Sequence, residues 1–380
     1  MKQMKTYKLR IYPNKDQIQL IHQTFGCCRF VFNYSLSRQK AKEELWYTVE
    51  QMVQNGQLPQ NNWKSDFFKK NEAIKAIREL KVNHPFLKEV DSIALQESVE
   101  RLHKAYDRSY KKLGGRPKFK SKRNLVQSFT TKCVNGNISI EGNMIKLPKL
   151  GRLKFKDSRS IEGTIKTATV TKSPSGKYFI SLTAETEIMP LPKLNTKVGI
   201  DVGIKEFAVC SNGLRIPNPK HYQKKQQRLA FLQKALARKK RGSRNYEKQR
   251  LKVAKCHENI FNQRKDFLHQ CSTQLIRENQ SIAIEHLNVT KMLKEKDLAQ
   301  AIAQAAWYEF RLQLEYKSNW YDRTLVVADP HYPSSQLCST CGDQNPLVKN
   351  LNVRHWTCPT CSTLHDRDYN ASLNLVKLIA

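Results

Sequence analysis

Two cysteine pairs near the C-terminus constrain the fold of this 380-residue chain more than any other feature. Two residues separate Cys338 from Cys341 and Cys358 from Cys361, and sixteen residues lie between the pairs. This spacing is typical of a tetrathiolate zinc site. Because four thiolates leave no open position for water, we expect one structural Zn²⁺ there, with His355 as a spare donor outside the ligand set. A redox-active Cys-x-x-Cys pair is the alternative.

The chain has ten cysteines, and the six outside these pairs are scattered. Two of the six are adjacent in the sequence, which suits a structural disulfide poorly. We expect all six to be small buried side chains of a protein in a reducing, cytoplasmic compartment. They are Cys27, Cys28, Cys133, Cys210, Cys256 and Cys271.

A carboxylate inside an apolar strand is the second constraint. Residues 197–204 (KVGIDVGI) read as a buried strand with Asp201 in the middle. A buried, unpaired carboxylate is costly, so Asp201 either forms an ion pair or binds a metal. Gly199 and Gly203 on either side mark the close approach of a ligand or of another backbone.

Two more acids follow in similar settings. Glu285 stands at the downstream end of a second expected strand, 281–286. In the C-terminal segment 366–379 we expect a helix with Asp366 as its N-cap. Asp368 then falls in the first turn, on the buried face of that helix, and points at the sheet. A partner for the helix dipole is the alternative role of Asp368.

Acids that are brought together need cations to stay ionised. Mg²⁺ prefers carboxylate oxygens and retained water, and two such ions, or Mn²⁺, can activate water and stabilise the leaving oxygen in phosphodiester hydrolysis. The residue types therefore predict a metal-dependent nuclease. Its catalytic and metal-binding residues would be Asp201, Glu285 and Asp368.

The charge balance indicates a polyanionic partner. Lys and Arg number 67 against 33 Asp and Glu, which gives a net charge of +34. Folding does not need this excess, whereas nucleic acid would relieve the repulsion and release counterions. An anionic membrane surface is the alternative. The sequence has no separate basic amphipathic anchor and no apolar run long enough to span a bilayer, so we expect no membrane partner.

Two basic segments are candidate nucleic-acid contacts. Residues 224–255 hold thirteen Lys or Arg and one acid, which favours phosphate contacts over a merely solvated helix face. Residues 113–123 (LGGRPKFKSKR) form a turn-rich basic stretch. Between the cysteine pairs, Arg354, His355 and Trp356 could touch nucleic acid, or Trp356 could cover the zinc. The expected contacts in the two basic segments are Arg116, Lys118, Lys120, Lys122, Arg123, Arg228, Arg238, Lys239, Lys240 and Arg241.

The hydrophobic periods predict a multidomain α+β protein. A strand at 5–12 leads into a helical region that ends near residue 112. Short strands between 137 and 184 are typical of a small antiparallel barrel, which the N-terminal strand could complete. From residue 197 the pattern is α/β, with helices over 220–279 and one helix over 298–320.

The three acids in this order, with a tetrathiolate insert just before the last, resemble the TnpB family, the transposon-encoded relatives of type V CRISPR effectors. The stretches that carry the resemblance are GIDVGIKEFAV, IAIEHLNVTKM, SSQLCSTCG and CPTCSTLHDRDYNASLNL. TYKLRIYPNKDQ, CRFVFNY and GRPKFKSKR fit the family as well. The resemblance covers nearly the whole chain, with a loose match in the helical region.

This resemblance implies an RNA-guided endonuclease that cuts double-stranded DNA beside a short adjacent motif. The guide RNA would come from the transposon end and bind one protein monomer, and its base pairing would carry the sequence specificity. The implied domains are a wedge β-barrel at 1–15 and 119–190 with a helical recognition lobe at 16–118 inserted in it. A RuvC-like nuclease domain of the RNase H fold follows at 191–332 and 363–380, with a zinc-binding, target-nucleic-acid-binding insert at 333–362.

Three other functions stay open. A guided DNA-binding regulator that no longer cuts would have lost one or more of the acids, all of which are present here. A transposase that acts directly on transposon ends would need its own means of recognising those ends. A compact CRISPR effector would differ mainly in the origin of its RNA.

Overall fold

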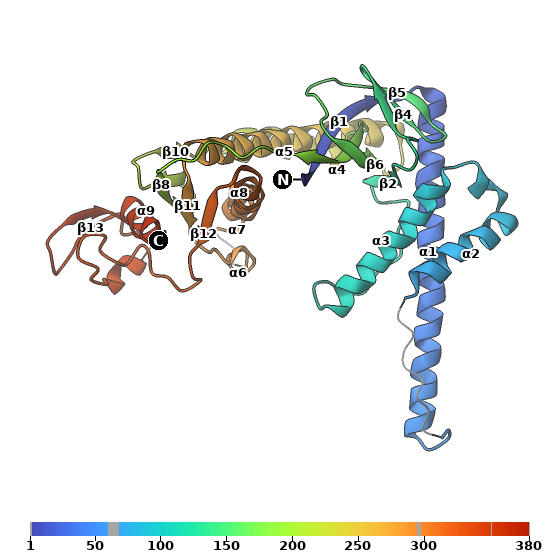
Figure 1. Cartoon of the computed structure of the whole chain (residues 1–380), viewed down its shortest axis with the longest axis horizontal. Coiled ribbons are helices and arrows are strands. Elements are labelled where there is room, and N and C mark those ends of the chain that lie inside the picture. Colours follow the sequence, from blue (N-terminus) through green and yellow to red (C-terminus); the bar gives the residue numbers. More distant parts are fainter. Residues whose placement is uncertain (1, 60–67, 295–297, 351, 380) are drawn as a thin grey trace. The chain divides into compact units, whose positions relative to one another are not determined.

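The structure is a computed structural model that describes residues 2–59, 68–294, 298–350 and 352–379 (Figure 1). The chain divides into two compact units, Lys2–Glu187 and the part from Ile188 onward. Each unit has a hydrophobic core of its own, as expected of segments that fold as domains. Within the described residues, every helix is too short or too polar to cross a bilayer.

The first unit is built on a seven-stranded antiparallel sheet. Its strands are β1 (Lys2–Tyr12), β2 (Gln127–Lys132), β3 (Ser139–Glu141), β4 (Met144–Leu147), β5 (Gly151–Phe155), β6 (Thr164–Lys172) and β7 (Tyr178–Glu187). They follow the order β2-β6-β7-β1-β5-β4-β3. The N-terminal strand thus lies inside the sheet and pairs with both β7 and β5. The sequence did not predict β2.

In the described part of the chain between β1 and β2, four helical segments are inserted. They are α1 (Lys15–Gln54), α2 (Lys70–Asn83), the 3-10 helix η1 (Pro85–Lys88) and α3 (Ser92–Tyr110). A capping box starts α1, because Asn14 accepts from the Gln17 N–H at 2.8 Å and Gln17 accepts from the Asn14 N–H at 3.0 Å. The apolar faces of these helices pack with the sheet in one core, which includes the buried thiols of Cys27 and Cys28. All ten cysteines of the chain are free thiols.

The second unit is built on a five-stranded mixed sheet. Its strands are β8 (Lys197–Val202), β9 (Glu206–Cys210), β10 (Arg215–Pro217), β11 (Ser281–Ile284) and β12 (Thr324–Val327), in the order β10-β9-β8-β11-β12. The first three pair antiparallel through short turns, whereas β11 runs parallel to both β8 and β12. Parallel neighbours need crossover connections, and helices supply them here.

Helices cover both faces of this second sheet (Figure 1). The helices of this unit are α4 (His221–Ala237), α5 (Arg244–Glu278), α6 (Val289–Met292), α7 (Ala299–Ala305), α8 (Trp307–Tyr321) and α9 (Arg367–Val376), of which α4 packs on α5. One face packs against α5 and α8, through residues such as Leu275 and Phe310. The other face packs against α9, through Leu375. Between β12 and α9 lie the 3-10 helix η2 (Pro346–Lys349) and the hairpin of β13 (His355–Thr357) and β14 (Leu364–Asp366).

Two expected helices differ from the structure. The single helix expected over 298–320 is divided at Ala306, which has a φ of 53° and ends α7 one residue before α8 begins. A left-handed alanine is costly, and no residue type there signals the break. The C-terminal helix begins as expected, after its cap Asp366, but ends at Val376 and not at Ile379.

Candidate active site and metal centre

Asp201, Glu285 and Asp368 line a single cavity of about 780 Å³ in the second unit. Asp201 lies within β8, Glu285 directly follows β11, and Asp368 lies in the first turn of α9. Three acids that the sequence places on separate elements therefore meet at one surface.

Strand alternation decides which face carries the acids. Side chains alternate along a strand, so Gly199 and Asp201 share one face of β8. By the same rule Ala283 and Glu285, which directly follows β11, point to one face. Ala283 pairs with Gly199 in the parallel register of the two strands, so this is the same face of the sheet. Ala283 packs with Leu375 of α9. Both acids therefore stand on the face of the sheet that α9 covers.

The close approach of α9 to β8 brings in the third acid. A Cβ atom on Gly199 would lie 2.1 Å from the carbonyl oxygen of Ser372 and 2.5 Å from the nitrogen of Val376. Only glycine allows backbones to come this close. Asp368 is one helical turn before Ser372, so this contact holds it beside Asp201. The expectation that Gly199 marks the approach of another backbone is confirmed.

The carboxylates of the cavity perturb one another. Asp201 and Glu285 are both half-buried, and both line this cavity. Burial, together with the carboxylates of Glu285 and Asp368, holds the pKa of Asp201 well above its usual range. Burial also raises the pKa of Glu285 to about 7, and the Val202 N–H, which donates to Glu285 Oε1 at 3.1 Å, opposes the rise. Such a set of crowded carboxylates is what a hard divalent cation binds.

Four cationic side chains share the walls of this cavity: Lys205, Lys220, Arg354 and Arg367. Arg354 Nη1 lies 3.4 Å from Asp368 Oδ2. The backbone carbonyl of Arg354 accepts from the Arg367 N–H at 2.9 Å, which joins the segment before β13 to the start of α9. Sequence reasoning singled out Arg354 but missed the other three. For Arg367, its position directly before Asp368 was the available signal.

Asp366 caps α9 and does not line the cavity. Its Oδ1 accepts from the Tyr369 N–H at 2.9 Å, and its Oδ2 forms an ion pair with Arg215 at 3.1 Å. Burial favours the neutral acid, but these hydrogen bonds outweigh it and hold the pKa of Asp366 below its usual value. The expected N-cap is confirmed, and Asp368 is the acid of this helix that faces the other two.

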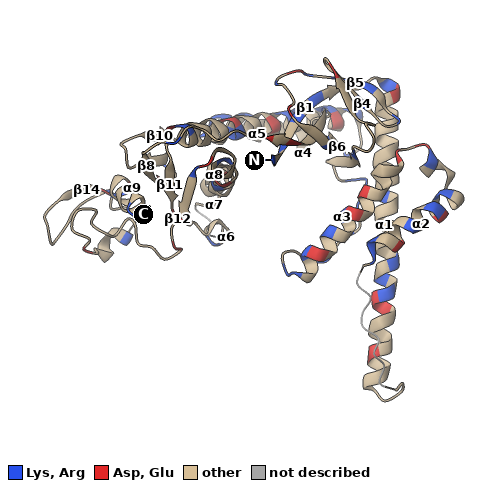
Figure 2. Ribbon diagram, viewed as in Figure 1, with Lys and Arg blue, Asp and Glu red and all other residues tan. Residues whose placement is uncertain are grey.

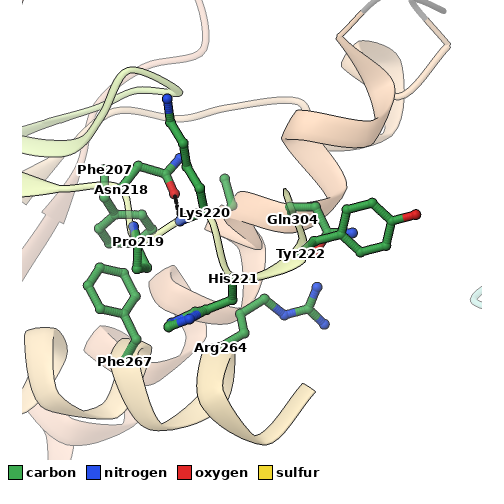
Figure 3. A pocket seen from close by; sticks show the side chains of 10 residues that line it. Phe207, Asn218, Pro219, Lys220, His221, Tyr222, Arg264, Phe267 and Gln304 are labelled. Carbon is green, nitrogen blue, oxygen red and sulfur yellow. Dashed lines mark hydrogen bonds between the residues drawn. The ribbon is translucent and has the colours of Figure 1, made fainter. Parts of the chain in front are cut away.

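The start of α4 contributes Lys220 and Tyr222 to the walls of this cavity. The same turn also lines a smaller pocket, together with His221 and Phe267 (Figure 3). Lys220 has a φ of 48°, and Asn218 Oδ1 accepts its backbone N–H at 3.1 Å. Asn218 Nδ2 donates to the Ile204 carbonyl at 2.8 Å, which ties this turn to the loop after β8. Beneath it the His221 ring packs edge-on against Phe267, with ring centroids 6.2 Å apart. Lys220 is therefore held in place at the cavity rim.

The four paired cysteines form a second cluster. The Sγ atoms of Cys338, Cys341, Cys358 and Cys361 all lie within 4.8 Å of one another. The Cys338 and Cys361 sulfurs are 3.5 Å apart, and the Cys341 and Cys358 sulfurs 3.6 Å. A tetrahedral site with Zn–S bonds of about 2.3 Å needs sulfurs about 3.8 Å apart. The grouping predicted from the spacing is confirmed, and it has the dimensions of a metal site.

Aromatic side chains cover this cysteine cluster. Trp356 is buried beside Cys338 and Cys358, and its ring centroid lies 4.8 Å from that of His365. Of the two roles considered for Trp356, the structure therefore supports that of a cover. His365 Nε2 lies 3.1 Å from Cys338 Sγ, so His365 is the histidine near the sulfurs. His355, the spare donor considered from the sequence, is exposed on β13.

Side-chain amides of α9 bind the segment that carries the first cysteine pair. Asn370 Nδ2 donates to the Leu337 carbonyl at 2.7 Å, and Asn370 Oδ1 accepts from the Ser339 N–H at 2.8 Å. Asn374 Nδ2 donates to the Ser334 carbonyl at 2.9 Å. The cysteine cluster and the helix that carries Asp368 are thus joined by direct hydrogen bonds.

Three family models match this chain. One described as "Probable transposase" matches residues 179–296, and one described as "Cas12f1-like, TNB domain" matches residues 307–375. A third, described as "Helix-turn-helix domain", matches residues 1–44. In the structure the described part of that last range forms β1 and much of the single helix α1, and not two helices joined by a turn.

Two relatives align along almost their whole length. A protein of Streptomyces pristinaespiralis named "Putative RNA-guided DNA endonuclease" is 38% identical over 380 residues, which cover 99% of this chain and 90% of that protein. The protein named "Putative RNA-guided DNA endonuclease InsQ" of Escherichia coli (strain K12) is 30% identical over 393 residues, covering 99% and 92%. This chain belongs to the TnpB family. The relationship extends over both units, not only over the sheet that carries the acids.

The fold of this TnpB-family chain is also similar to a solved one. The chain aligns with a protein in the "Cryo-EM structure of the Cas12f1-sgRNA-target DNA complex" with a TM-score of 0.58. The alignment covers 99% of both chains at 13% sequence identity. At this identity the likeness concerns the fold alone.

In this member of the TnpB family, α4 and α5 form a basic hairpin (Figure 2). The two helices pack through Leu229, Val253 and Ile260. Arg228 is exposed on α4, and the cluster expected at the hairpin turn is exposed as well. That cluster consists of Arg238, which ends α4, and of Lys239, Lys240 and Arg241 in the turn.

The basic residues of 113–123 fall into two groups. Arg116 forms an ion pair with Glu43 at 3.0 Å, and the backbone N–H and carbonyl of Lys120 both bond to the side chain of Asn33, at 2.8 and 2.9 Å. The Lys120 ammonium lies over the Phe32 ring, and burial lowers its pKa to about 8. These two residues fasten the segment to α1. Arg116 and Lys120 keep much of their surface exposed all the same, as do the others, Lys118, Lys122 and Arg123.

Proposed function

We propose that this chain is a transposon-encoded, RNA-guided endonuclease that cuts double-stranded DNA beside a short adjacent motif. The observation that carries the proposal is the single cavity lined by Asp201, Glu285 and Asp368. Membership of the TnpB family and the printed names of the two relatives support the guided part of it. The net charge of +34 fits a protein that holds both RNA and DNA.

The donor set fits divalent metal ions. Asp201, Glu285 and Asp368 would hold two Mg²⁺, or Mn²⁺, because these hard cations take carboxylate oxygens. A cation would also offset the burial and the repulsion that together raise the pKa of Asp201 and Glu285. Bound ions at such a site activate water and neutralise charge on the phosphoryl group during in-line hydrolysis. We therefore assign these three acids as catalytic residues.

Other residues of the cavity position the acids and the strand. The Val202 N–H fixes one oxygen of Glu285, and Arg354 holds Asp368 from the side of the insert. Lys205 and Lys220 stand on the walls and would attract phosphates of the strand that is cut. Three acids alone would repel a polyanion, so these cations are part of the proposed machinery.

We also propose that one structural Zn²⁺ occupies the cysteine cluster. Its ligands would be Cys338, Cys341, Cys358 and Cys361, whose sulfur separations match a tetrathiolate site. Through Asn370 and Asn374 the zinc-bound segment would keep α9 in place. Its role in the reaction is thus to position Asp368, because four thiolates leave no site for water.

The order β10-β9-β8-β11-β12, with one acid within β8 and another directly after the adjacent β11, supports a RuvC-like nuclease domain at 191–332 and 363–380. The insert at 333–362 would bind target nucleic acid. In the first unit, a wedge barrel at 1–15 and 119–190 and a helical lobe at 16–118 would bind the guide RNA. We propose one protein monomer with one RNA, acting in the prokaryotic cytoplasm. A regulator that no longer cuts is disfavoured, because such a protein has no need of acids gathered in one cavity.

Sequencing of the RNA that copurifies with the full chain tests this proposal. A guide should appear as one RNA species that ends in a segment of variable sequence. DNA matched to that segment should then be cut in Mg²⁺, and unmatched DNA should not. The same complex with Asp201→Ala should bind the matched DNA and leave it intact. The proposal is wrong if no discrete RNA copurifies, or if cutting ignores the match between RNA and DNA.

A further inference from the structure

Between α4 and α5 lies a groove of about 650 Å³ that the proposed catalysis does not use. We call it the hairpin groove. It is separate from the cavity of the three acids, since no lining residue is common to both. Its lining residues are Lys225, Arg228, Phe231, Leu232, Lys252, Lys255, Cys256 and Asn259.

An aromatic ring stands open to solvent in this groove. Phe231 is 70% exposed, whereas Leu229, two residues earlier, is buried in the seam between the helices. A phenylalanine so exposed adds nothing to the packing of α4 on α5. Large apolar side chains left in water on a charged surface are typical of binding sites.

The charge around that ring is of one sign. Arg228, Lys252 and Lys255 are exposed along the groove, and none of its lining residues, all within the described part of the chain, is acidic. Lys225 is already engaged, because its ammonium donates to Gln263 Oε1 at 2.8 Å and also to Asn259. These two hydrogen bonds join α4 to α5. The cations that remain for a ligand are Arg228, Lys252 and Lys255.

An aromatic platform flanked by cations fits one chemistry, that of unpaired nucleotides. A base in a single strand has a free face to stack on a ring, and its flanking phosphates bind cations. Bases inside a duplex have no free face, so a duplex could use only the cations. We propose that the hairpin groove binds unpaired nucleic acid, with a base stacked on Phe231 and the neighbouring phosphates on Arg228, Lys252 and Lys255. The inference deepens the proposed function, since guide RNA and opened DNA both contain unpaired strands.

Binding measured apart from cutting tests the groove. Fluorescence anisotropy would follow the full chain binding to a single-stranded RNA, a single-stranded DNA and a duplex, each of about 12 nucleotides. Phe231→Ala should weaken binding of at least one single strand about tenfold and change duplex binding less than about twofold. The strand with the larger loss identifies the source, guide or target. Phe231→Trp should keep the affinity, whereas Phe231→Leu should lose it, because leucine keeps the apolar surface and lacks the ring.

Phe261→Ala is the matched control. Phe261 is also exposed, at 44%, on α5, but it does not line the groove. Replacement of Arg228, Lys252 and Lys255 by glutamine should make single-strand binding less sensitive to salt. The slope of log affinity against log salt concentration should fall by the equivalent of about two phosphate contacts or more. The proposal is overturned if Phe231→Ala binds both single strands as the natural chain does, if Phe261→Ala loses as much, or if duplex binding falls equally. A chain that binds strands through Phe231 but cuts no DNA would keep this site and refute the proposed nuclease.

Discussion

The cysteine cluster and the acid cluster are both sets of metal-ligand side chains, but the chain builds them in different ways. The cysteines lie within residues 338–361, and their spacing alone predicts that they meet. The acids come from β8, the end of β11 and α9. They meet only because β8 pairs with β11 and α9 comes close to β8 at Gly199. The thiol cluster is a local property, and the acid cluster is a property of the whole fold.

The two clusters should also contribute to stability with opposite signs. Thiolates that bind zinc supply folding free energy, since the site does not exist in the unfolded chain. The ionised acids are unfavourable in the metal-free protein, because burial and, after it, the neighbouring carboxylates raise the pKa of Asp201 and of Glu285. Removing a thiol should therefore destabilise the protein, while neutralising an acid should leave the metal-free protein as stable as before or more stable.

The largest expected effect belongs to the acids. Asp201→Asn, Glu285→Gln and Asp368→Asn should each lower the cutting rate by about 1,000-fold or more, because each removes a carboxylate from the proposed metal site. RNA binding and the melting temperature in EDTA should not fall. Single-turnover cutting and thermal melting of the same preparations measure both. A variant that cuts normally, or that melts well below the natural chain, would contradict the role assigned to that acid.

Loss of a thiolate should act in the opposite direction on stability. Cys358→Ser should release the zinc, make residues 333–362 sensitive to protease and lower cutting at least about tenfold, because α9 loses the segment that Asn370 and Asn374 bind. Elemental analysis should find about one zinc per natural chain and none in the variant. Cys133→Ser is the matched control, since Cys133 is a half-buried free thiol outside the cluster. A zinc-free preparation that cuts normally would end the structural-zinc proposal.

Gly199 tests how the fold assembles the acids. Gly199→Ala places a methyl group where the Ser372 carbonyl and the Val376 nitrogen now lie, so α9 must move away from β8. Overpacking of this kind costs about 1–3 kcal/mol, and a shift of Asp368 by about 1 Å can cost about 100-fold in rate. Gly114→Ala should change neither the stability nor the cutting rate, because a Cβ there meets nothing within 4 Å. If Gly199→Ala cuts as the natural chain does, the close approach does not position Asp368.

The sequence predicted much of this site for physical reasons. A polar residue stands out within an apolar strand, so the sequence identified Asp201. Helix capping rules distinguished Asp366, the N-cap, from Asp368, the acid on the buried face. The grouping of the cysteines followed from their spacing. By contrast, nothing in the sequence marks the break at Ala306, because alanine ordinarily continues a helix and gives no signal of the left-handed backbone that it adopts here. The cations Lys205 and Lys220 were missed because a surface lysine gives no signal of its own until the fold supplies the cavity around it.

The acid cluster also makes a prediction about pH. In the folded, metal-free protein the pKa of Glu285 is about 7, above that of an unfolded glutamate, and the pKa of Asp201 is raised as well. The folded state therefore binds protons that the unfolded state has released. The stability gained in this way is complete below about pH 4 and is lost as the pH rises through 7. In EDTA the melting temperature should fall by a few degrees between pH 5 and pH 8. Glu285→Gln should flatten this fall, and a profile unchanged by the substitution would mean that Glu285 does not titrate there.

The smallest expected effect comes from the acid that stands outside the cavity. Asp366→Ala removes the N-cap of α9, worth about 1 kcal/mol, and a part-exposed ion pair with Arg215, worth about 0–1 kcal/mol. Cutting should stay within about threefold of the natural rate, because the first turn of α9 remains packed at Gly199. Asp366→Asn should restore most of the lost stability, since asparagine caps as well as aspartate, although it cannot keep the ion pair. Thermal melting and single-turnover cutting of both variants, beside Asp368→Asn, decide the matter. If Asp366→Ala abolished cutting while Asp368→Asn cut normally, the two acids of this helix would have exchanged roles, and the acid cluster would have to be rebuilt around Asp366.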